Sequence, residues 1–277
     1  MRGKTRAIRI AHATQTKKIK DHDMRYTFGR TQTAAARLET IAEFFNPLAM
    51  EFIAEFINEP VNTGLDLGCG PGFTTEMLRQ TLCGAKVSGL DNSENFLKLA
   101  REKFPKCNFL QHDVTRRPFP LQPNVMYERF LLPHLKNAVN LVNAWLGELL
   151  PGGFLFIDEL EAIDTNVPVF QQYLAINAGL VRSQDANLFV GKILAAGAYT
   201  AKVLYNEPIR LPVCNSLAAK WFYPNTVTIW EKEKFILDTV PAEQRKQISS
   251  DLAKIQESND GKRDIVWTMR RMVLHKD

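Results

Sequence analysis

The chain has 277 residues, of which 45% are hydrophobic, and a formal net charge of +5 at pH 7. This length and apolar content predict one globular domain with a sizeable core. No window approaches eighteen uninterrupted apolar residues, which argues against a membrane-spanning helix. The four cysteines lack the paired spacing of a zinc site or a disulfide framework, and this favours reduced thiols in a cytoplasmic protein.

The positive charge is concentrated at the start of the chain. Residues 1–20 hold seven Lys or Arg and no acid, and the rest of the chain has 28 basic and 30 acidic residues. This pattern predicts a basic, flexible arm over residues 1–22, with a transit segment or a nucleic-acid-binding arm as alternatives. No apolar segment follows the charges, so a signal peptide is not expected.

Residues 23–60 read as a helical segment. Apolar side chains recur on one side from Leu38 to Phe45, and Pro47 predicts a break before a second helix over Leu48–Phe56.

A glycine-rich turn follows. The apolar run Val61–Leu67 predicts a buried strand, Gly68-Cys-Gly-Pro-Gly72 a turn, and Thr74–Thr81 a helix. A strand, a bare turn and a helix N-terminus form a typical site for a nucleotide-like ligand. A dinucleotide site also needs a third glycine three residues after Gly70, where Phe73 stands and would crowd a diphosphate.

Strands and helices then alternate, which predicts a parallel α/β sheet. The strand Lys86–Asp91 ends in an acid 21 residues after Gly70, the spacing expected of a residue that binds ribose hydroxyls. Ser93 can cap the next helix, Glu94–Phe104. The remaining predicted strands are Asn108–Gln111, Val125–Tyr127, Phe154–Ile157, Ala201–Pro212 and Val266–His275, and the remaining predicted helices are Val167–Ser183, Asp185–Tyr199, Cys214–Ile236 with an interruption near Pro224, and Pro241–Gln256.

The run Asp66-Leu-Gly-Cys-Gly-Pro-Gly72, the acid Asp91 and the Leu149-Leu-Pro-Gly-Gly153 turn together resemble the class I S-adenosylmethionine-dependent methyltransferases of the small-molecule type. The resemblance implies an α/β fold: a seven-stranded, mostly parallel Rossmann-like sheet with helices on both faces and an antiparallel last strand. It also implies an N-terminal helical lid over residues 23–60, and a methyltransferase domain over residues 61–277 with a substrate-side insertion near residues 160–200.

The resemblance implies that the cofactor is S-adenosyl-L-methionine, which leaves as S-adenosyl-L-homocysteine, and that no metal takes part. Asp91 is expected to bind the ribose hydroxyls, Asp113 the adenine amino group, and Arg37 the methionine carboxylate as a bidentate partner. The cofactor-binding residues predicted in this way are Tyr26, Arg37, Asp66, Gly68, Gly70, Asp91, Asn92, Phe96, Asp113, Val114 and Arg129.

Methyl transfer from a sulfonium is an in-line displacement, so alignment of the reactants carries most of the catalysis. A base is needed only when the acceptor is protonated at the working pH. His134 and Glu159 are the candidate catalytic residues; the alternative is that His134 caps a helix and that Glu159 is a solvated loop residue.

The acceptor is expected to be a small molecule, since no Asn-Pro-Pro-Tyr or Asp-Pro-Pro-Tyr follows the fourth strand and no RNA-binding module is evident. Methylation at oxygen, nitrogen or carbon stays open. A partner role for nucleic acid is not expected, and self-association into a homo-oligomer is compatible with the sequence. The alternatives are an RNA or protein methyltransferase that uses the basic arm, and a relative that uses the bound cofactor for a non-methylating reaction such as cyclisation.

Overall fold

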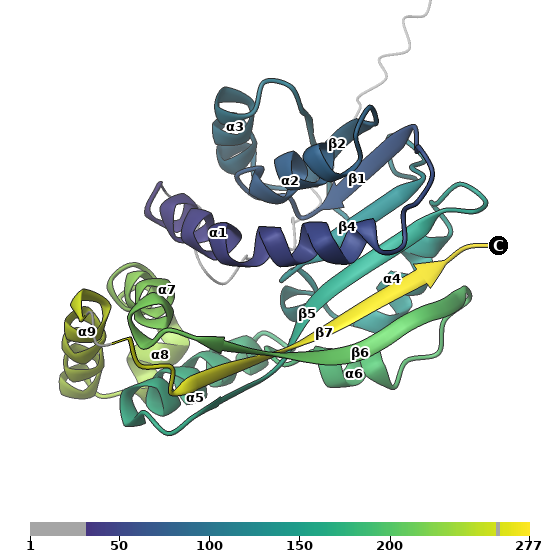
Figure 1. The fold of residues 1–277 in the computed structure, drawn as a ribbon. Helices are drawn as coiled ribbons and strands as arrows, with labels where there is room; N and C mark the ends of the chain where they lie inside the picture. Colours follow the sequence, from purple (N-terminus) through teal and green to yellow (C-terminus); the bar gives the residue numbers. More distant parts are fainter. Residues whose placement is uncertain (1–31, 259–260) are drawn as a thin grey trace, which may run out of the picture.

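The structure is a computed structural model that describes residues 32–258 and 261–277. A seven-stranded sheet lies at its centre (Figure 1). The strands are β1 (Thr63–Leu67), β2 (Lys86–Asp91), β3 (Asn108–Gln111), β4 (Val125–Arg129), β5 (Phe154–Thr165), β6 (Lys202–Val213) and β7 (Ile265–His275). The helices are α1 (Gln32–Ala54), α2 (Phe73–Thr81), α3 (Glu94–Lys103), α4 (Ala138–Leu146), α5 (Pro168–Ser183), α6 (Gly191–Ala195), α7 (Asn215–Thr228), α8 (Lys234–Thr239) and α9 (Ala242–Glu257), with a 3-10 turn at Leu132–His134.

The strand order is β3-β2-β1-β4-β5-β7-β6. Strands β1 to β5 pair in parallel, and β7 runs antiparallel to both β5 and β6. The predicted fold class, with its antiparallel last strand, is therefore confirmed. The chain continues from β1 to β2 and β3 on one side of β1, and then crosses to β4 on the other side of β1. This reversal leaves a crevice at the carboxyl ends of β1 and β4, where ligands bind in such sheets.

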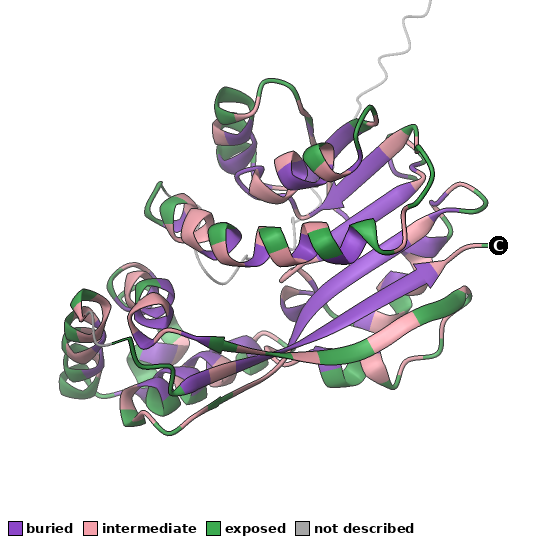
Figure 2. Ribbon diagram, in the orientation of Figure 1, coloured by how far each residue is buried: buried purple, intermediate pink, exposed green. Residues whose placement is uncertain are grey.

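Alternate residues of the central strands fill two cores, one on each face of the sheet. Tyr127, Phe156 and Val273 pack with α1 and α2 on one face. Met126 and Ile157, their chain neighbours, pack with α4 and α6 on the other face. Burial on both faces explains why these strands read as continuous apolar runs, and Figure 2 shows the central strands buried along most of their length.

A third core lies beyond the parallel part of the sheet. The strands β5 and β7 pair along their full length, from Phe154 opposite His275 to Thr165 opposite Ile265. Their far ends pack with α5, α7, α8 and α9 (Figure 1). Three fully buried side chains, Phe170, Trp221 and Trp230, belong to this core. The prediction that the fifth strand ends at Ile157 was wrong, because pairing with β7 extends it by eight residues.

Helix α1 connects the two helical groups. It packs against both α2 and α7 (Figure 1). Its Phe45 is fully buried against Trp221, Phe130 and Trp267. The predicted break at Pro47 was wrong: α1 continues through this residue. A proline costs a helix one backbone hydrogen bond, and here packing of Phe45 and Ala49 on either side of it holds the helix together.

The predicted helix Asp185–Tyr199 was also wrong, since only Gly191–Ala195 is helical. Asp185 adopts a left-handed backbone conformation with φ 58°, which ends regular helix there. A Cβ at Gly191 would lie 2.8 Å from Cβ of Glu161, so a glycine lets α6 approach β5 closely. The helix predicted over Cys214–Ile236 is interrupted as expected, but not near Pro224: α7 continues through this proline to Thr228, and α8 begins at Lys234.

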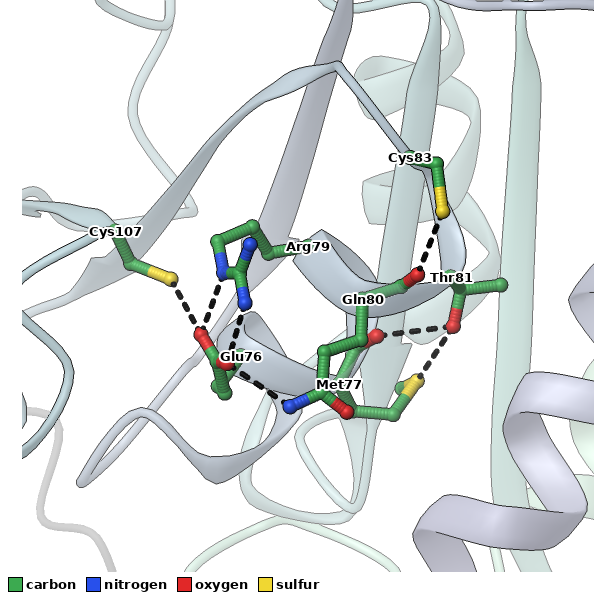
Figure 3. Close-up of polar contacts among 7 residues, drawn as sticks. All are labelled: Glu76, Met77, Arg79, Gln80, Thr81, Cys83 and Cys107. Atoms are coloured by element: carbon green, nitrogen blue, oxygen red, sulfur yellow. Dashed lines mark hydrogen bonds and ion pairs between the residues drawn. The ribbon is translucent and has the colours of Figure 1, made fainter.

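One polar contact joins α2 to the segment that leads into β3, and it is made by Glu76 (Figure 3). Glu76 accepts two hydrogen bonds of 2.7 Å from Arg79 and one of 3.4 Å from the Cys107 thiol. The Arg79 guanidinium holds the pKa of Glu76 down at about 2, so this carboxylate stays charged throughout the physiological range. Across residues 32–258 and 261–277, no helix is both long and apolar enough to cross a membrane.

Candidate functional site

Two adjoining pockets lie at the carboxyl ends of the parallel strands. The first, here called the glycine-loop pocket, has a volume of about 990 Å³, which includes the open solvent at its mouth. The second, here called the aromatic pocket, has a volume of about 660 Å³, again with the open solvent included. They share Leu38, Ile41, Phe130 and His134 in their walls, so the two pockets adjoin each other.

The floor of the first pocket is the turn after β1. Gly68 has φ 68°, and a Cβ there would lie 2.7 Å from Cδ1 of Leu131, so the turn requires glycine at this position. Gly70 donates its N–H to Oδ2 of Asp91 over 2.9 Å, and Ser93 donates its N–H to Oδ1 over 2.7 Å. Asp91 therefore joins the glycine turn to the start of α3 while its side chain lines the pocket.

Asp66 lies beneath the turn. It is buried, and its Oδ2 accepts hydrogen bonds of 2.6 Å from the hydroxyls of Thr74 and Thr75. Burial raises its pKa to about 6, against the lowering effect of the two threonine hydroxyls and of Arg129. Asp66 does not line the glycine-loop pocket. Its hydrogen bonds to Thr74 and Thr75 instead hold α2 against the turn.

The variant Asp66→Asn should remove part of the pH dependence of stability. Folding raises the pKa of the Asp66 carboxyl from 3.8 to about 6, so the folded chain binds this proton more tightly than the unfolded chain does. The resulting stabilisation of the fold is present at low pH and is lost as pH rises through 6. The free energy of unfolding of the parent chain, relative to the variant, should fall by up to about 3 kcal/mol between pH 4 and pH 7. Urea unfolding of both chains at each pH measures this difference; a constant difference would contradict the assignment.

Four further predicted residues line the glycine-loop pocket: Asn92, Phe96, Asp113 and Val114. Asp113 also closes a turn, since its Oδ1 accepts from the N–H and the hydroxyl of Thr115 over 2.9 and 2.7 Å. The carbonyl of Val114 accepts 2.8 Å from the Trp145 indole. The adenine-binding roles of Asp113 and Val114 remain predictions.

Arg129, the last residue of β4, is the cation of this pocket's wall. Its Nη2 donates 2.8 Å to Oδ1 of Asn46, and its guanidinium carbon lies 5.7 Å from the Phe45 ring centre and 5.9 Å from that of Phe130. Its Nη1 is buried and has no hydrogen-bond acceptor among the residues that the structure describes. A buried guanidinium N–H in such a position has room for one more acceptor.

Arg37 lines one of the two pockets, whereas His134 lines both. Arg37 lines the aromatic pocket and not the glycine-loop pocket, and its role at the methionine carboxylate stays a prediction. His134 ends the 3-10 turn and lines both pockets. Burial, aided by the charge of Arg37, lowers the pKa of His134 to about 4, so the imidazole is neutral at pH 7 and is a weak base.

Glu159 is not a solvated loop residue. It is fully buried inside β5, where its Oε1 accepts hydrogen bonds of 2.8 Å from the N–H groups of both Leu131 and Leu132. Neither pocket is lined by Glu159, and it therefore positions the segment that carries Phe130 and His134. Burial raises its pKa to about 7.

Glu128 is the buried neighbour of Glu159. Burial and then the charge of Glu159 raise its pKa well above the usual range. Its two oxygens receive no hydrogen bond from the part of the chain that is described, but a protonated Glu128 can donate one to Glu159, which lowers the pKa of Glu159. Both carboxyl groups lie buried behind the pocket wall, where burial favours their protonated forms.

Sequence reasoning missed the segment that divides the two pockets. Phe130 has a left-handed backbone with φ 57°, a conformation that its residue type does not indicate. The wall residues Leu38, Ile41 and Leu135 read as ordinary core residues. Tyr26 lies outside the described residues. No group of three or more His, Cys, Asp or Glu among residues 32–258 and 261–277 could hold a metal ion.

Comparison with known proteins supports this geometry. A family model described as "Methyltransferase domain" matches residues 65–153. A trans-aconitate 2-methyltransferase of Rhodopseudomonas palustris (strain BisA53) is 32% identical over 130 residues, which cover 45% of this chain and 51% of the relative. The chain thus spans about half the length of this curated relative.

Two solved structures share the fold. Coclaurine N-methyltransferase bound to N-methylheliamine and SAH gives a TM-score of 0.54 at 15% identity, covering 83% of this chain and 72% of that one. Phosphoethanolamine N-methyltransferase 2 of Haemonchus contortus, in complex with phosphomonomethylethanolamine and S-adenosylhomocysteine, gives 0.53 at 16% identity, covering 91% and 60%. Residues 65–153, which include the glycine turn, therefore resemble a methyltransferase domain, and the chain shares its fold with these two structures.

Proposed function

We propose that the chain is an S-adenosylmethionine-dependent methyltransferase that acts on a small molecule. The observation that carries the proposal is the glycine-loop pocket, where Gly68, Gly70, Asp91 and Arg129 meet at the carboxyl ends of β1, β2 and β4. The match to a methyltransferase domain over residues 65–153 and the relative named trans-aconitate 2-methyltransferase support the same conclusion.

The residues of this pocket fit the cofactor at its ribose and at its methionine carboxylate. Asp91 is a carboxylate at a strand end beside a turn whose glycines leave the backbone bare, an arrangement suited to ribose hydroxyls. The buried Nη1 of Arg129 lacks an acceptor within the described chain, and the methionine carboxylate would supply one as a charged hydrogen bond. The bound cofactor would supply an electrophilic methyl group; the chain aligns the acceptor with it and excludes water.

The variant Arg129→Met should weaken binding of S-adenosylhomocysteine by about tenfold to hundredfold, because the ligand carboxylate would lose its cation. Isothermal titration calorimetry of the full chain measures this loss. Binding of 5′-methylthioadenosine, which lacks the amino-acid end, should change little in the same variant.

Arg210→Gln provides a matched control, since Arg210 is an exposed arginine of β6 and lines neither pocket. Its affinity for S-adenosylhomocysteine should equal that of the parent chain. Absence of any binding by the parent chain would refute the proposed function. Mass analysis of products formed from S-adenosylmethionine and candidate acceptors tests methyl transfer directly.

A further inference from the structure

The aromatic pocket has a mostly apolar wall. Of its fourteen described lining residues, only Arg37, His134, Tyr173 and Asn177 have polar side chains other than an indole, and none is an Asp or Glu. The other lining residues are Leu38, Ile41, Phe130, Pro133, Leu160, Ile163, Leu174, Leu188, Phe222 and Trp267. A ligand in this pocket would therefore bury its surface mainly against hydrocarbon and aromatic rings.

Polar side chains of this wall make hydrogen bonds inside the protein. The Tyr173 hydroxyl accepts a 2.6 Å hydrogen bond from the Asn225 amide. Asn177 donates 2.8 Å to the carbonyl of Tyr173. Arg37 also has contacts within the protein, among them the 2.7 Å hydrogen bond from its Nε to the carbonyl of Trp221. These contacts form without a ligand, so the wall is in place before a ligand enters.

Three aromatic rings of the wall are nearly parallel. The Tyr173 and Phe222 rings stack with their centres 4.3 Å apart and their planes 20° apart. The Phe222 and Trp267 rings are stacked as well, with centres 6.2 Å apart and planes 19° apart. Aromatic pairs gain energy beyond the burial of their apolar area, so a wall of this kind favours a ligand that carries an aromatic ring.

Burial in this wall disfavours charge of either sign. It lowers the pKa of His134 to about 4, aided by the charge of Arg37, so a positive imidazolium is disfavoured there. It raises the pKa of Tyr173 to about 12, against smaller lowering effects of Arg37 and Asn225, so a negative phenolate is disfavoured too. A charged group of a ligand beside these two residues would suffer the same loss of hydration.

We infer that the aromatic pocket binds the methyl acceptor, and that this acceptor is an uncharged, apolar molecule with an aromatic ring that packs against Tyr173, Phe222 and Trp267. Phe130 and His134 line both pockets, so the bound ring would lie next to the cofactor pocket. This inference rests on the proposed function and names the class of its acceptor. A tricarboxylate such as trans-aconitate would bring three charges to a wall where burial disfavours charge.

A matched series of probes tests the class of ligand: 3-phenylpropan-1-ol, 3-cyclohexylpropan-1-ol, 3-phenylpropanoate, 3-phenylpropylamine and trans-aconitate. Ligand-observed NMR titration of the full chain at pH 7 measures each dissociation constant. The phenyl alcohol should bind at least about tenfold more tightly than each of the three charged probes, which lose more hydration on burial. It should bind about two- to tenfold more tightly than the cyclohexyl alcohol, which has no aromatic ring.

Two variants test the place of binding. Leu188→Trp and Ile163→Trp each enlarge a half-buried residue of the wall, and each should weaken binding of the phenyl alcohol by at least about tenfold. Leu237→Trp is the matched control, because Leu237 is an exposed leucine of α8 that lines neither pocket. Its affinity for the phenyl alcohol should equal that of the parent chain. Thermal unfolding verifies that each variant is folded.

Three results would overturn the inference: failure of the phenyl alcohol to bind, equal or tighter binding of a charged probe or of the cyclohexyl alcohol, and unchanged binding in folded Leu188→Trp and Ile163→Trp. Binding of S-adenosylhomocysteine to the same chains is measured in parallel and tests the proposed function independently. If the parent chain binds S-adenosylhomocysteine but not the phenyl alcohol, the proposed function stands and the inferred class of acceptor is wrong.

Discussion

Asp91→Ala is expected to weaken the binding of S-adenosylhomocysteine by more than about hundredfold. The change removes the carboxylate that would bind the ribose hydroxyls. It also removes the acceptor for the N–H groups of Gly70 and Ser93, at 2.9 and 2.7 Å, so the glycine turn loses its fixed position beside α3. Calorimetric titration of the full chain measures the dissociation constant.

Two controls separate ligand contact from loss of structure. Asp91→Asn keeps one side-chain oxygen acceptor and should show an intermediate loss of affinity. Asp238→Ala removes an exposed acid that pairs only with Lys234 among the described residues, and should leave affinity unchanged. If folded Asp91→Ala, judged by its thermal unfolding, binds the ligand as well as the parent chain, the assignment of this pocket is wrong.

The sequence predicted the first half of the sheet closely because local signals determine it. The strands Lys86–Asp91 and Asn108–Gln111 have the predicted bounds. Ser93 caps α3 as expected, by accepting from the N–H of Phe96 over 3.4 Å. A glycine turn, an apolar run and a capping serine each depend on a few adjacent residues, so a single sequence reveals them.

Other features depend on contacts between distant residues, and the sequence did not reveal them. The length of β5 depends on pairing with β7, more than a hundred residues later in the chain. The continuity of α1 through Pro47 depends on packing against elements on both sides of the proline. In each case tertiary packing outweighed the local preference that the sequence displays.

The candidate site shows the same division. Nine of the residues predicted for the site line the glycine-loop pocket: Gly68, Gly70, Asp91, Asn92, Phe96, Asp113, Val114, Arg129 and His134. Arg37 faces the aromatic pocket, and Asp66 and Glu159 lie behind the walls. The sequence shows that a strand contains an acid, but it does not show which face of the strand contacts the ligand. That face depends on the register of the strand, which could be predicted only for the glycine turn and its neighbours.

Glu159→Ala is expected to destabilise the fold by about 3 kcal/mol and to reduce methyl transfer strongly. The variant leaves the N–H groups of Leu131 and Leu132 without their acceptor in a buried setting, and each unpaired group costs about 1–3 kcal/mol. It also releases the segment Phe130–His134, which forms the shared wall of the two pockets. Urea unfolding measures the first effect and kcat/KM with an identified acceptor the second.

Glu128→Gln is the matched variant because it changes the other member of the same buried pair. Burial and the charge of Glu159 hold the pKa of Glu128 well above its usual range, which favours the protonated form of Glu128. A glutamine amide can donate a hydrogen bond to Glu159 as a protonated carboxyl would, and both stability and kcat/KM should therefore stay near those of the parent chain. If Glu128→Gln were as damaging as Glu159→Ala, both groups would have to be ionised in the fold. If Glu159→Ala retained full activity, the position of Phe130 and His134 would have to be set by contacts other than the two backbone hydrogen bonds to Glu159.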